Sequence, residues 1–297
     1  MAKFGITIYK NLAPEGSLSS GSPTLEAGSF TESFEGRFGV DPDRDSMAKV
    51  TRNIASGSVR YLMNYDNPLP NVSHVYVHWA DYNGVDGQYL VEPWNSTVND
   101  RDLSGDGLIN GGTFVVRTGD RYTMSPSEEE GQALAEIHPN YALSGVQAGF
   151  MFYSDGTPGW TDSTVTIGFK NLMWLSELDI IAPLYTVERS YTTEGKKQTR
   201  TLGGKLVTST YGAVKRATLS IQFESVDETT KLALEDLYTT MQGDTHPFVI
   251  THDEGLTIGT SGPDAIEGLY VVKFADTLTI TETHEKLYDI SFEVKEI

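Results

Sequence analysis

Residues 190–297 constrain the fold most, because the spacing of their apolar residues changes from that of a strand to that of a helix and back. Residues 217–223 alternate between apolar and polar side chains, a pattern typical of a strand with one buried face. The apolar face holds Ala217, Leu219, Ile221 and Phe223, and the polar face holds Thr218, Ser220 and Gln222. This stretch therefore predicts a half-buried strand.

A helix is expected directly after this strand. Ser225 and Glu228 have the Ser-x-x-Glu spacing of a capping box, in which each side chain satisfies a backbone N–H of the first turn. One apolar stripe follows at i, i+3, i+4 and i+7, formed by Leu234, Leu237, Tyr238 and Met241. Gly243 can end a helix in the left-handed conformation. We expect a helix over about residues 227–242.

Three apolar runs after the helix predict further strands. They are residues 247–252, which lead into an acidic turn, and residues 268–274 and 286–294. Pro183 interrupts an apolar run near residues 181–187, where we place a boundary. The fold class expected is mainly β, with two β-sandwich or barrel-like domains. The first covers residues 1–185, and the second, residues 186–297, contains the one packed helix.

The first domain begins with a predicted strand at residues 1–9 and a Gly/Ser-rich arm at residues 11–33. Met47, Val50 and Ile54 have helical spacing, but residues 58–65 resemble a strand, so a short helix and a hairpin both remain open here. Further strands are expected at residues 71–82, 88–93, 112–117, 149–153 and 163–169. Residues 171–178 are expected to form a loop or a short helix.

A second helix is predicted at residues 126–137. Ser125 and Glu128 repeat the capping-box spacing, and Pro126 occupies the first helical position, where a missing N–H costs nothing. The acidic run 128–130 suits the positive end of a helix dipole. The alternative is that this run binds a cation.

Alternation over residues 74–79 places His74, Tyr76 and His78 on one face of the predicted aromatic strand. On a strand, four residues span ~13 Å, so the two histidines cannot share one ion. The three side chains are either covered by a neighbouring element or exposed as a candidate binding face.

The composition excludes some functions. The chain has 297 residues, no cysteine and a formal charge of -19. Such an acidic protein repels phosphate backbones and anionic membranes, so no nucleic-acid partner is expected. No stretch approaches the ~20 apolar residues of a membrane span, and the N-terminus has no apolar signal-peptide core.

The sharpest metal-like motif runs from Asp102 to Asn110. Oxygen-bearing side chains stand at Asp102, Ser104, Asp106 and Asn110, with Gly107 in the place that permits the sharp turn of a calcium loop. The twelfth position is Thr113 rather than a carboxylate, and a predicted strand follows instead of a helix. An Asp/Gly-rich β-turn explains most of the same spacing. We expect no resident metal or cofactor, with this calcium loop as the candidate exception.

The aromatic residues support two interpretations, and no residue is a candidate for catalysis. Trp79, Trp94, Trp160, Trp174, Tyr82 and Tyr89 can form a sugar-stacking surface or fill the core of a β-sandwich. His246 and His252 lie near acidic residues but have no serine in a nucleophile-elbow context. We therefore expect no enzyme and no catalytic residue.

Residues 190–297 resemble the ring-forming domain of tailed-bacteriophage distal tail proteins and related baseplate proteins. The resemblance rests on the Gly203-Gly204 turn, Tyr211-Gly212, the strand at 216–223, the acidic-capped helix, and the strands at 247–250, 270–274 and 288–294. In distal tail proteins the ring domain usually comes first, whereas here it is the second half of the chain.

The resemblance implies a structural protein of the virion tail tip or baseplate, made in the cytoplasm of a bacterial host. It also implies a homo-oligomeric ring held by strand edges and the arm, with other tail-tip, tail-tube or hub proteins as partners. The alternative is a carbohydrate-binding β-sandwich module that binds a surface glycan.

Overall fold

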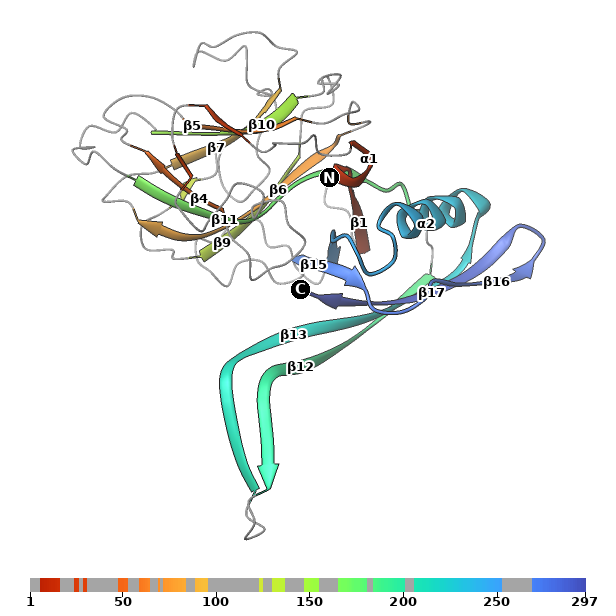
Figure 1. The fold of residues 1–297 in the computed structure, drawn as a ribbon. Helices are drawn as coiled ribbons and strands as arrows, with labels where there is room; N and C mark the ends of the chain where they lie inside the picture. Colours follow the sequence, from red (N-terminus) through yellow and green to blue (C-terminus); the bar gives the residue numbers. More distant parts are fainter. Residues whose placement is uncertain are drawn as a thin grey trace. The chain divides into compact units, whose positions relative to one another are not determined.

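A computed structural model describes residues 6–16, 24–26, 29–30, 48–52, 59–64, 69, 72–83, 89–95, 123–124, 130–136, 147–154, 165–180, 184–200, 206–252 and 269–297. These residues are mostly β-strand, which confirms the mainly β fold class (Figure 1). No helix among them is long and apolar enough to cross a membrane. The chain divides into two compact units. Unit 1 is Met1–Leu178 with Ile250–Leu269, and unit 2 is Asp179–Val249 with Tyr270–Ile297.

This division differs in two respects from the sequence-based domains of residues 1–185 and 186–297. Its boundary lies between Leu178 and Asp179. The division also assigns Ile250–Leu269 to unit 1, so the second unit is interrupted in sequence.

Unit 1 contains two antiparallel sheets, as a β-sandwich does. The first is centred on β11 (Val165–Glu177), which pairs with β1 (Ile6–Asn11), β4 (Ala48–Arg52) and β6 (His74–Asn83), while β3 (Ser29–Phe30) extends β4 and β9 (Glu130–Glu136) extends β6. The second has the order β2 (Thr24–Glu26), β5 (Val59–Asn64), β10 (Gln147–Ser154), β7 (Tyr89–Asn95) and β8 (Thr123–Met124).

The two elements left open at residues 47–65 are both strands, but they do not form a hairpin. Strand β4 pairs with β3 and β11 in one sheet, whereas β5 pairs with β2 and β10 in the other. The Gly/Ser-rich arm at 11–33 supplies α1 (Ala13–Gly16), β2 and β3. Parts of this arm therefore belong to the sheets of unit 1.

Two sequence-based predictions in unit 1 are wrong. The helix predicted at 126–137 is replaced over its described part by β9, which pairs with β6 from Glu130 to Glu136. The loop or short helix predicted at 171–178 is instead the second half of β11. In both places a neighbouring strand offers a complete row of backbone partners, and this tertiary pairing overrides the local preference.

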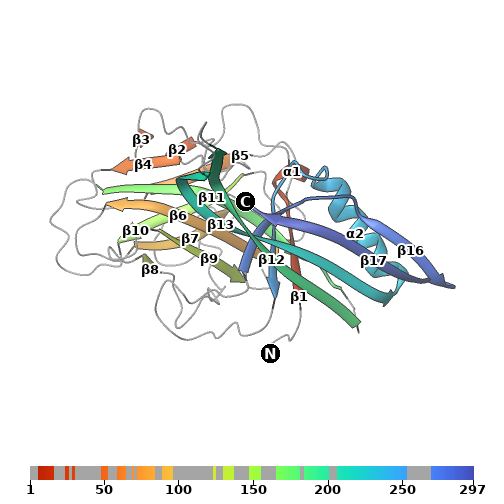
Figure 2. The same ribbon diagram turned by 90° about the horizontal axis from the view of Figure 1, so that it is seen from below.

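Unit 2 is built on one antiparallel sheet, also seen in Figure 2. The strand order is β12 (Leu184–Arg200), β13 (Leu206–Val226), β17 (Leu287–Glu296) and β15 (Leu269–Phe274), with β14 (Phe248–His252) next to β15 and with β16 (Thr279–His284) also paired to β17. The predicted alternation is confirmed, because Ala217, Leu219, Ile221 and Phe223 are all buried.

Helix α2 (Glu228–Thr240) confirms the predicted helix, although its cap differs. The carboxylate of Asp227 accepts the backbone N–H of Thr230 at 2.8 Å. Ser225, expected as the cap, has a positive φ of 55°, and its backbone N–H donates to Asp289 at 2.9 Å. The capping box was therefore placed on the wrong residue, because the chain is still turning at Ser225. At the other end Gly243 takes the left-handed conformation as predicted, with φ 63°.

Aromatic side chains join α2 to the sheet. Tyr238 meets Phe274 edge-on with ring centroids 4.9 Å apart, and Phe274 in turn meets Phe292 at 5.4 Å and Phe248 at 4.9 Å. Each such aromatic pair contributes about 0.5–1.5 kcal/mol beyond the burial of its area. Phe274 therefore ties the helix to two neighbouring strands.

We predict that Asp227→Ala destabilises the fold and Asp227→Asn does so much less, because asparagine is an equally good N-cap residue. The hydrogen bonds from Thr230 hold the pKa of Asp227 below its ordinary value of 3.8. The carboxylate's contribution is therefore complete above pH 3.8 and is lost as the pH falls through the lower, folded value. Chemical denaturation from about pH 7 to about pH 3 measures this. An Asp227→Ala variant as stable as the native chain at neutral pH would contradict the assignment.

Candidate functional site

The β12–β13 hairpin extends beyond the sheet to which it belongs. Its two strands pair from Leu184 opposite Glu224 out to Arg200 opposite Leu206. Strand β17 covers the other edge of β13 only from Thr218 onward. Within the described residues, the outer part of the hairpin is therefore a two-stranded ribbon. Figure 1 shows the two strands leaving the sheet together and bending.

The ribbon is bent, and one of its edges has no neighbouring strand within the described residues. The pairing shifts register between Glu194 and Lys196, an irregularity of the kind that bends a strand. Strand β12 has no neighbour on its outer edge within the described part of the chain. A two-stranded ribbon is marginally stable in water, and an open edge presents unpaired N–H and C=O groups to other chains. The ribbon is therefore suited to receive a further strand.

The base of β12 also exposes apolar side chains. Leu184 is 59% exposed, Tyr185 37% and Tyr191 50%. Tyr185 stands opposite Phe223 and Tyr191 opposite Ala217, and both of these partners are buried. Directly opposite residues of an antiparallel pair share one face. The core face of the sheet thus continues onto β12 but is not covered there.

Arg189 lies on the same face, between the two tyrosines. Its Nη1 donates to the Tyr191 hydroxyl at 3.2 Å, and its guanidinium stands 5.2 Å from the centre of the Tyr270 ring. Tyrosine and arginine are the residue types most enriched at the energetic centres of protein interfaces. We name Tyr185, Arg189 and Tyr191 the β12 surface. Leu184 pairs with the exposed Glu224 and lies on the other face of the strand.

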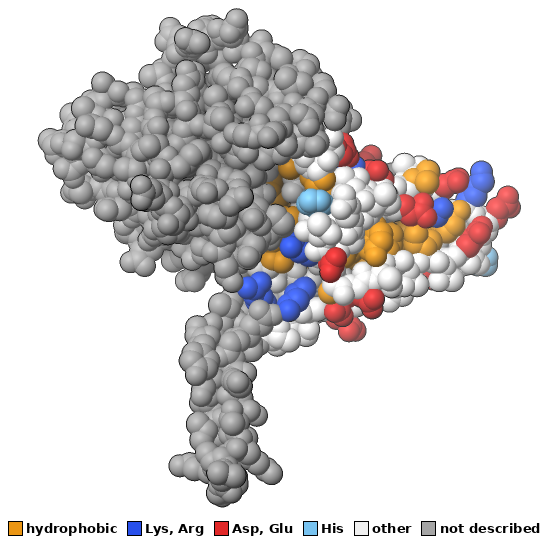
Figure 3. Space-filling view, viewed as in Figure 1, with side chains coloured by type: hydrophobic (Ala, Val, Ile, Leu, Met, Phe, Trp, Pro, Cys, Tyr) orange, Lys and Arg blue, Asp and Glu red, His pale blue; other side chains and the backbone are white. Residues whose placement is uncertain are grey.

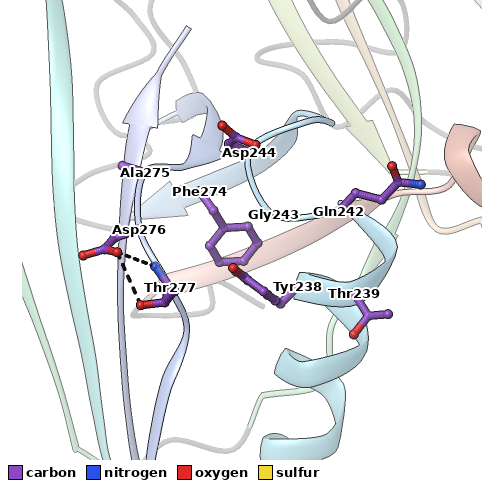
Figure 4. A pocket seen from close by; sticks show the side chains of 9 residues that line it. All are labelled: Tyr238, Thr239, Gln242, Gly243, Asp244, Phe274, Ala275, Asp276 and Thr277. Atoms are coloured by element: carbon purple, nitrogen blue, oxygen red, sulfur yellow. Dashed lines mark hydrogen bonds between the residues drawn. The ribbon is translucent and has the colours of Figure 1, made fainter.

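A second candidate is an open pocket of about 470 Å³ at the C-terminal end of α2 (Figure 4). Its lining consists of Tyr238, Thr239, Gln242, Gly243, Asp244, Phe274, Ala275, Asp276 and Thr277. The carboxylate of Asp276 accepts the backbone N–H of Thr277 at 2.7 Å and its hydroxyl at 3.3 Å. Gly243 is required here for its backbone rather than for space, because its φ of 63° is one that other residues rarely adopt, whereas a Cβ would stand at an ordinary contact distance of 3.5 Å from the Tyr238 hydroxyl oxygen. One aromatic ring edge, an amide, hydroxyls and two carboxylates suit a small polar ligand.

The candidate binding face on β6 is not open in the structure. His74 is 9% exposed, Tyr76 0% and His78 2%. The ring of His74 packs edge-on against Tyr9 with centroids 4.7 Å apart, and its Nδ1 lies 3.0 Å from the Ser73 hydroxyl oxygen. Burial favours the first of the two alternatives, a row covered by neighbouring elements.

Of the remaining predicted site residues, some lie outside the described part of the chain and others lie on strands of unit 1. Asp102, Ser104, Asp106 and Asn110 lie outside the described residues, as does Trp160. Trp174 is fully buried, in agreement with a core role. Trp79 and Trp94 lie on β6 and β7. The described residues hold no group of three or more His, Asp or Glu side chains that could bind a metal ion.

Neither the β12 surface nor the pocket was among the sites predicted from the sequence. The sequence does contain a signal for the β12 surface. Tyr185, Arg189 and Tyr191 are an even number of residues apart, so on a strand they lie on one face. The pocket had no such signal, since it joins the end of α2 to the turn after β15.

Comparison with known proteins identifies no family, because no family model and no curated protein matches the chain. Two solved structures are similar at 12% identity. One is a mutant of a family 29 carbohydrate-binding module, with a TM-score of 0.32 over 59% of this chain and 87% of that one. The other is CpGH89CBM32-4 of Clostridium perfringens in complex with GlcNAc-alpha-1,4-galactose, with a TM-score of 0.29 over 57% and 94%. Likenesses this weak assign no role to any residue.

His246, in the turn after α2, has a pKa that reports on burial and charge near the end of this helix. Burial, and secondarily the positive charge of Lys273, hold its pKa below the ordinary value of 6.5. We predict that Lys273→Met raises this pKa but leaves it below 6.5, because burial is the larger cause. Titration of the histidine ring signals by NMR measures the shift, and His246→Gln identifies the signal. An unchanged value in Lys273→Met would show that the lysine charge does not act on this ring.

Proposed function

We propose that the protein is a structural component that assembles with copies of itself through the β12–β13 hairpin. The supporting observation is the β12 surface, where the core face of the sheet continues past its covered edge. Fully burying a large apolar side chain is worth about 1.5–3 kcal/mol. A partner that covers Tyr185 and Tyr191 therefore gains an appreciable part of a binding free energy.

The open edge of the hairpin can add main-chain hydrogen bonds to this apolar contact. A strand added to the outer edge of β12 would pair backbone groups that have no strand partner within the described residues. Such addition gives affinity through main-chain hydrogen bonds, and the exposed Tyr and Arg side chains give specificity. The proposed role is therefore mechanical and non-catalytic.

The setting we propose is the tail tip or baseplate of a tailed bacteriophage. This step rests on the resemblance of residues 190–297 to ring-forming tail domains. It makes the assembly a ring in the virion tail, with other tail-tip, tail-tube or hub proteins as further partners. A ring requires contacts between unlike surfaces of neighbouring copies, and an exposed hairpin with an open edge can supply one of these surfaces.

A second candidate function is carbohydrate binding, and the observation that favours it is the pocket at the end of α2. Sugars bind where an aromatic ring lies beside carboxylate, amide and hydroxyl groups. Tyr238, Gln242, Asp276 and Thr277 bring these groups together in one open hollow. Phe274 lies beneath Tyr238 and is almost fully buried, so only the tyrosine is available for stacking.

Native mass spectrometry tests the assembly. We expect the full chain to form a defined oligomer and a variant that replaces residues 194–214 with a two-residue Asn-Gly turn to form less of it. The double substitution Tyr185→Ser and Tyr191→Ser should also weaken association, because it removes apolar area from the β12 surface without shortening the hairpin.

The control for this experiment is Leu232→Ser. Leu232 is equally exposed, at 54%, but lies on α2 rather than on β12. We expect this variant to assemble as the native chain does. A native chain that stays monomeric at high concentration would count against self-assembly, and equal loss in the control would count against the β12 surface.

Carbohydrate binding is tested by titrating soluble glycans while following tryptophan and tyrosine fluorescence. Under the second candidate function we expect saturable binding that Asp276→Ala reduces, because the carboxylate is lost from the pocket. Glu282→Gln, which alters an acidic residue outside the lining, should bind normally. Saturable binding that persists in Asp276→Ala but is lost in Trp94→Ala would move the sugar site to unit 1.

A further inference from the structure

The open pocket at the end of α2 is negatively charged. Its described lining contains two carboxylates, Asp244 and Asp276, and no Lys, Arg or His. Figure 4 shows that the two come from different segments, Asp244 from the turn after α2 and Asp276 from the turn after β15. Figure 3 shows acidic side chains recurring over the described surface of unit 2. A ligand in this pocket therefore meets two negative charges and no positive one from the described lining.

The carboxylate of Asp276 is held in place but can still accept hydrogen bonds. Its Oδ1 accepts two hydrogen bonds from Thr277, with the backbone nitrogen at 2.7 Å and the hydroxyl oxygen at 3.3 Å. A carboxylate has two oxygens, and each can accept more than one hydrogen bond. Within the described residues, no group donates to Oδ2 of Asp276. Thr277 therefore orients this carboxylate and leaves Oδ2 available to a ligand.

The described cations near the pocket do not neutralise it. Among the described residues, no Lys or Arg forms an ion pair with Asp244 or Asp276. Lys273 precedes Phe274, which lines the pocket, and neighbouring residues of a strand point to opposite faces. The charge of Lys273 acts instead on His246. The last turn of α2 holds no basic residue, although the partial negative charge at the C-terminal end of a helix favours cations.

The other polar groups of the lining can accept hydrogen bonds from a cation. The hydroxyl oxygens of Tyr238 and Thr239 and the amide oxygen of Gln242 are all acceptors. A protonated primary amine has three N–H donors and no acceptor, so it can use both these oxygens and the two carboxylates. A ligand with a carboxylate or a phosphate would instead bring like charges together, which opposes binding.

We propose that the pocket at the end of α2 binds a sugar that carries a protonated primary amine, in preference to the same sugar with a hydroxyl or an acetamido group. This inference rests on the second candidate function, carbohydrate binding in this pocket, and adds the charge of the sugar. A volume of about 470 Å³ suits a small ligand. Asp244 and Oδ2 of Asp276 accept the N–H groups of the amine, and the ring of Tyr238 provides the aromatic surface beside the sugar.

Three matched disaccharides test this selectivity in calorimetric titrations of the full chain. Cellobiose, chitobiose and N-acetylated chitobiose share one backbone, and the second carbon of each ring carries a hydroxyl, an amine or an acetamido group. We expect chitobiose to bind about fivefold more tightly than the other two at low ionic strength. Salt screens exposed charges, so this advantage should shrink as the salt concentration rises. It should also disappear when the pH is raised until the amine loses its proton.

Two neutral variants and one control locate the effect. Asp276→Asn removes the charge but keeps an oxygen that can accept from Thr277, and Asp244→Asn removes the other charge of the lining. We expect each variant to reduce the advantage of chitobiose over cellobiose and the double variant to abolish it. Glu282→Gln removes one negative charge from β16, outside the lining, and should keep the full advantage. Circular dichroism checks that each variant keeps its fold. Butylamine, an amine without a sugar ring, is the fourth probe, and we expect it to bind more weakly than chitobiose.

The outcomes separate this inference from the second candidate function. If the three disaccharides bind equally and Asp276→Ala weakens all of them, carbohydrate binding in the pocket stands and the preference for an amine is overturned. If none of them binds, the second candidate function fails and this inference fails with it. Butylamine that binds as tightly as chitobiose would overturn the assignment of a sugar. An advantage that survives in the double variant, or that Glu282→Gln reduces equally, would overturn the assignment to this pocket.

Discussion

The fold of unit 2 depends on the pairing of β13, a strand of 21 residues, with a strand on each of its edges. From Thr218 onward this strand is paired on both edges, by β12 and β17, and its apolar face is buried. Before Thr218 its only described partner is β12. The same strand therefore serves both as the centre of a packed sheet and as one side of a ribbon. Its central part fixes the direction in which the ribbon leaves the sheet.

The parts of the fold that could be predicted are those in which apolar residues recur in the sequence at the spacing of a strand or of a helix. The alternation at 217–223 and the stripe of α2 are both set by burial against one face, and both were placed correctly. The predictions failed where a distant strand determined the structure. Strand β9 forms because β6 lies beside it, even though the residues around Pro126 have the signals of a helix start. Ser225 failed as a cap because the turn from β13 into α2 gives that role to Asp227.

The candidate site was less predictable than the fold. A strand face that combines apolar and charged side chains has a mixed pattern, as on β12, where Tyr185, Arg189 and Tyr191 are separated by Thr, Val, Glu and Ser residues. The pocket depends on where α2 ends relative to the turn after β15, which no local pattern encodes. By contrast, the His74, Tyr76 and His78 row was visible in the sequence, but its burial was not. Alternation shows which residues share a face, while the rest of the fold determines which face is covered.

The order of β12, β13 and β17 along the chain also determines when the ribbon can form. The turn of the hairpin joins residues only six apart, Arg200 and Leu206, whereas β17 reaches β13 from Lys295, 77 residues beyond Thr218. Local contacts form faster than distant ones, and the hairpin emerges from the ribosome before β17 has been made. A growing chain can therefore form the ribbon before β17 exists to pair with the base of β13. At that stage, as far as the described strands are concerned, both strands of the hairpin have an unpaired outer edge along their full length, so the growing hairpin offers another chain more open backbone groups than the finished sheet does.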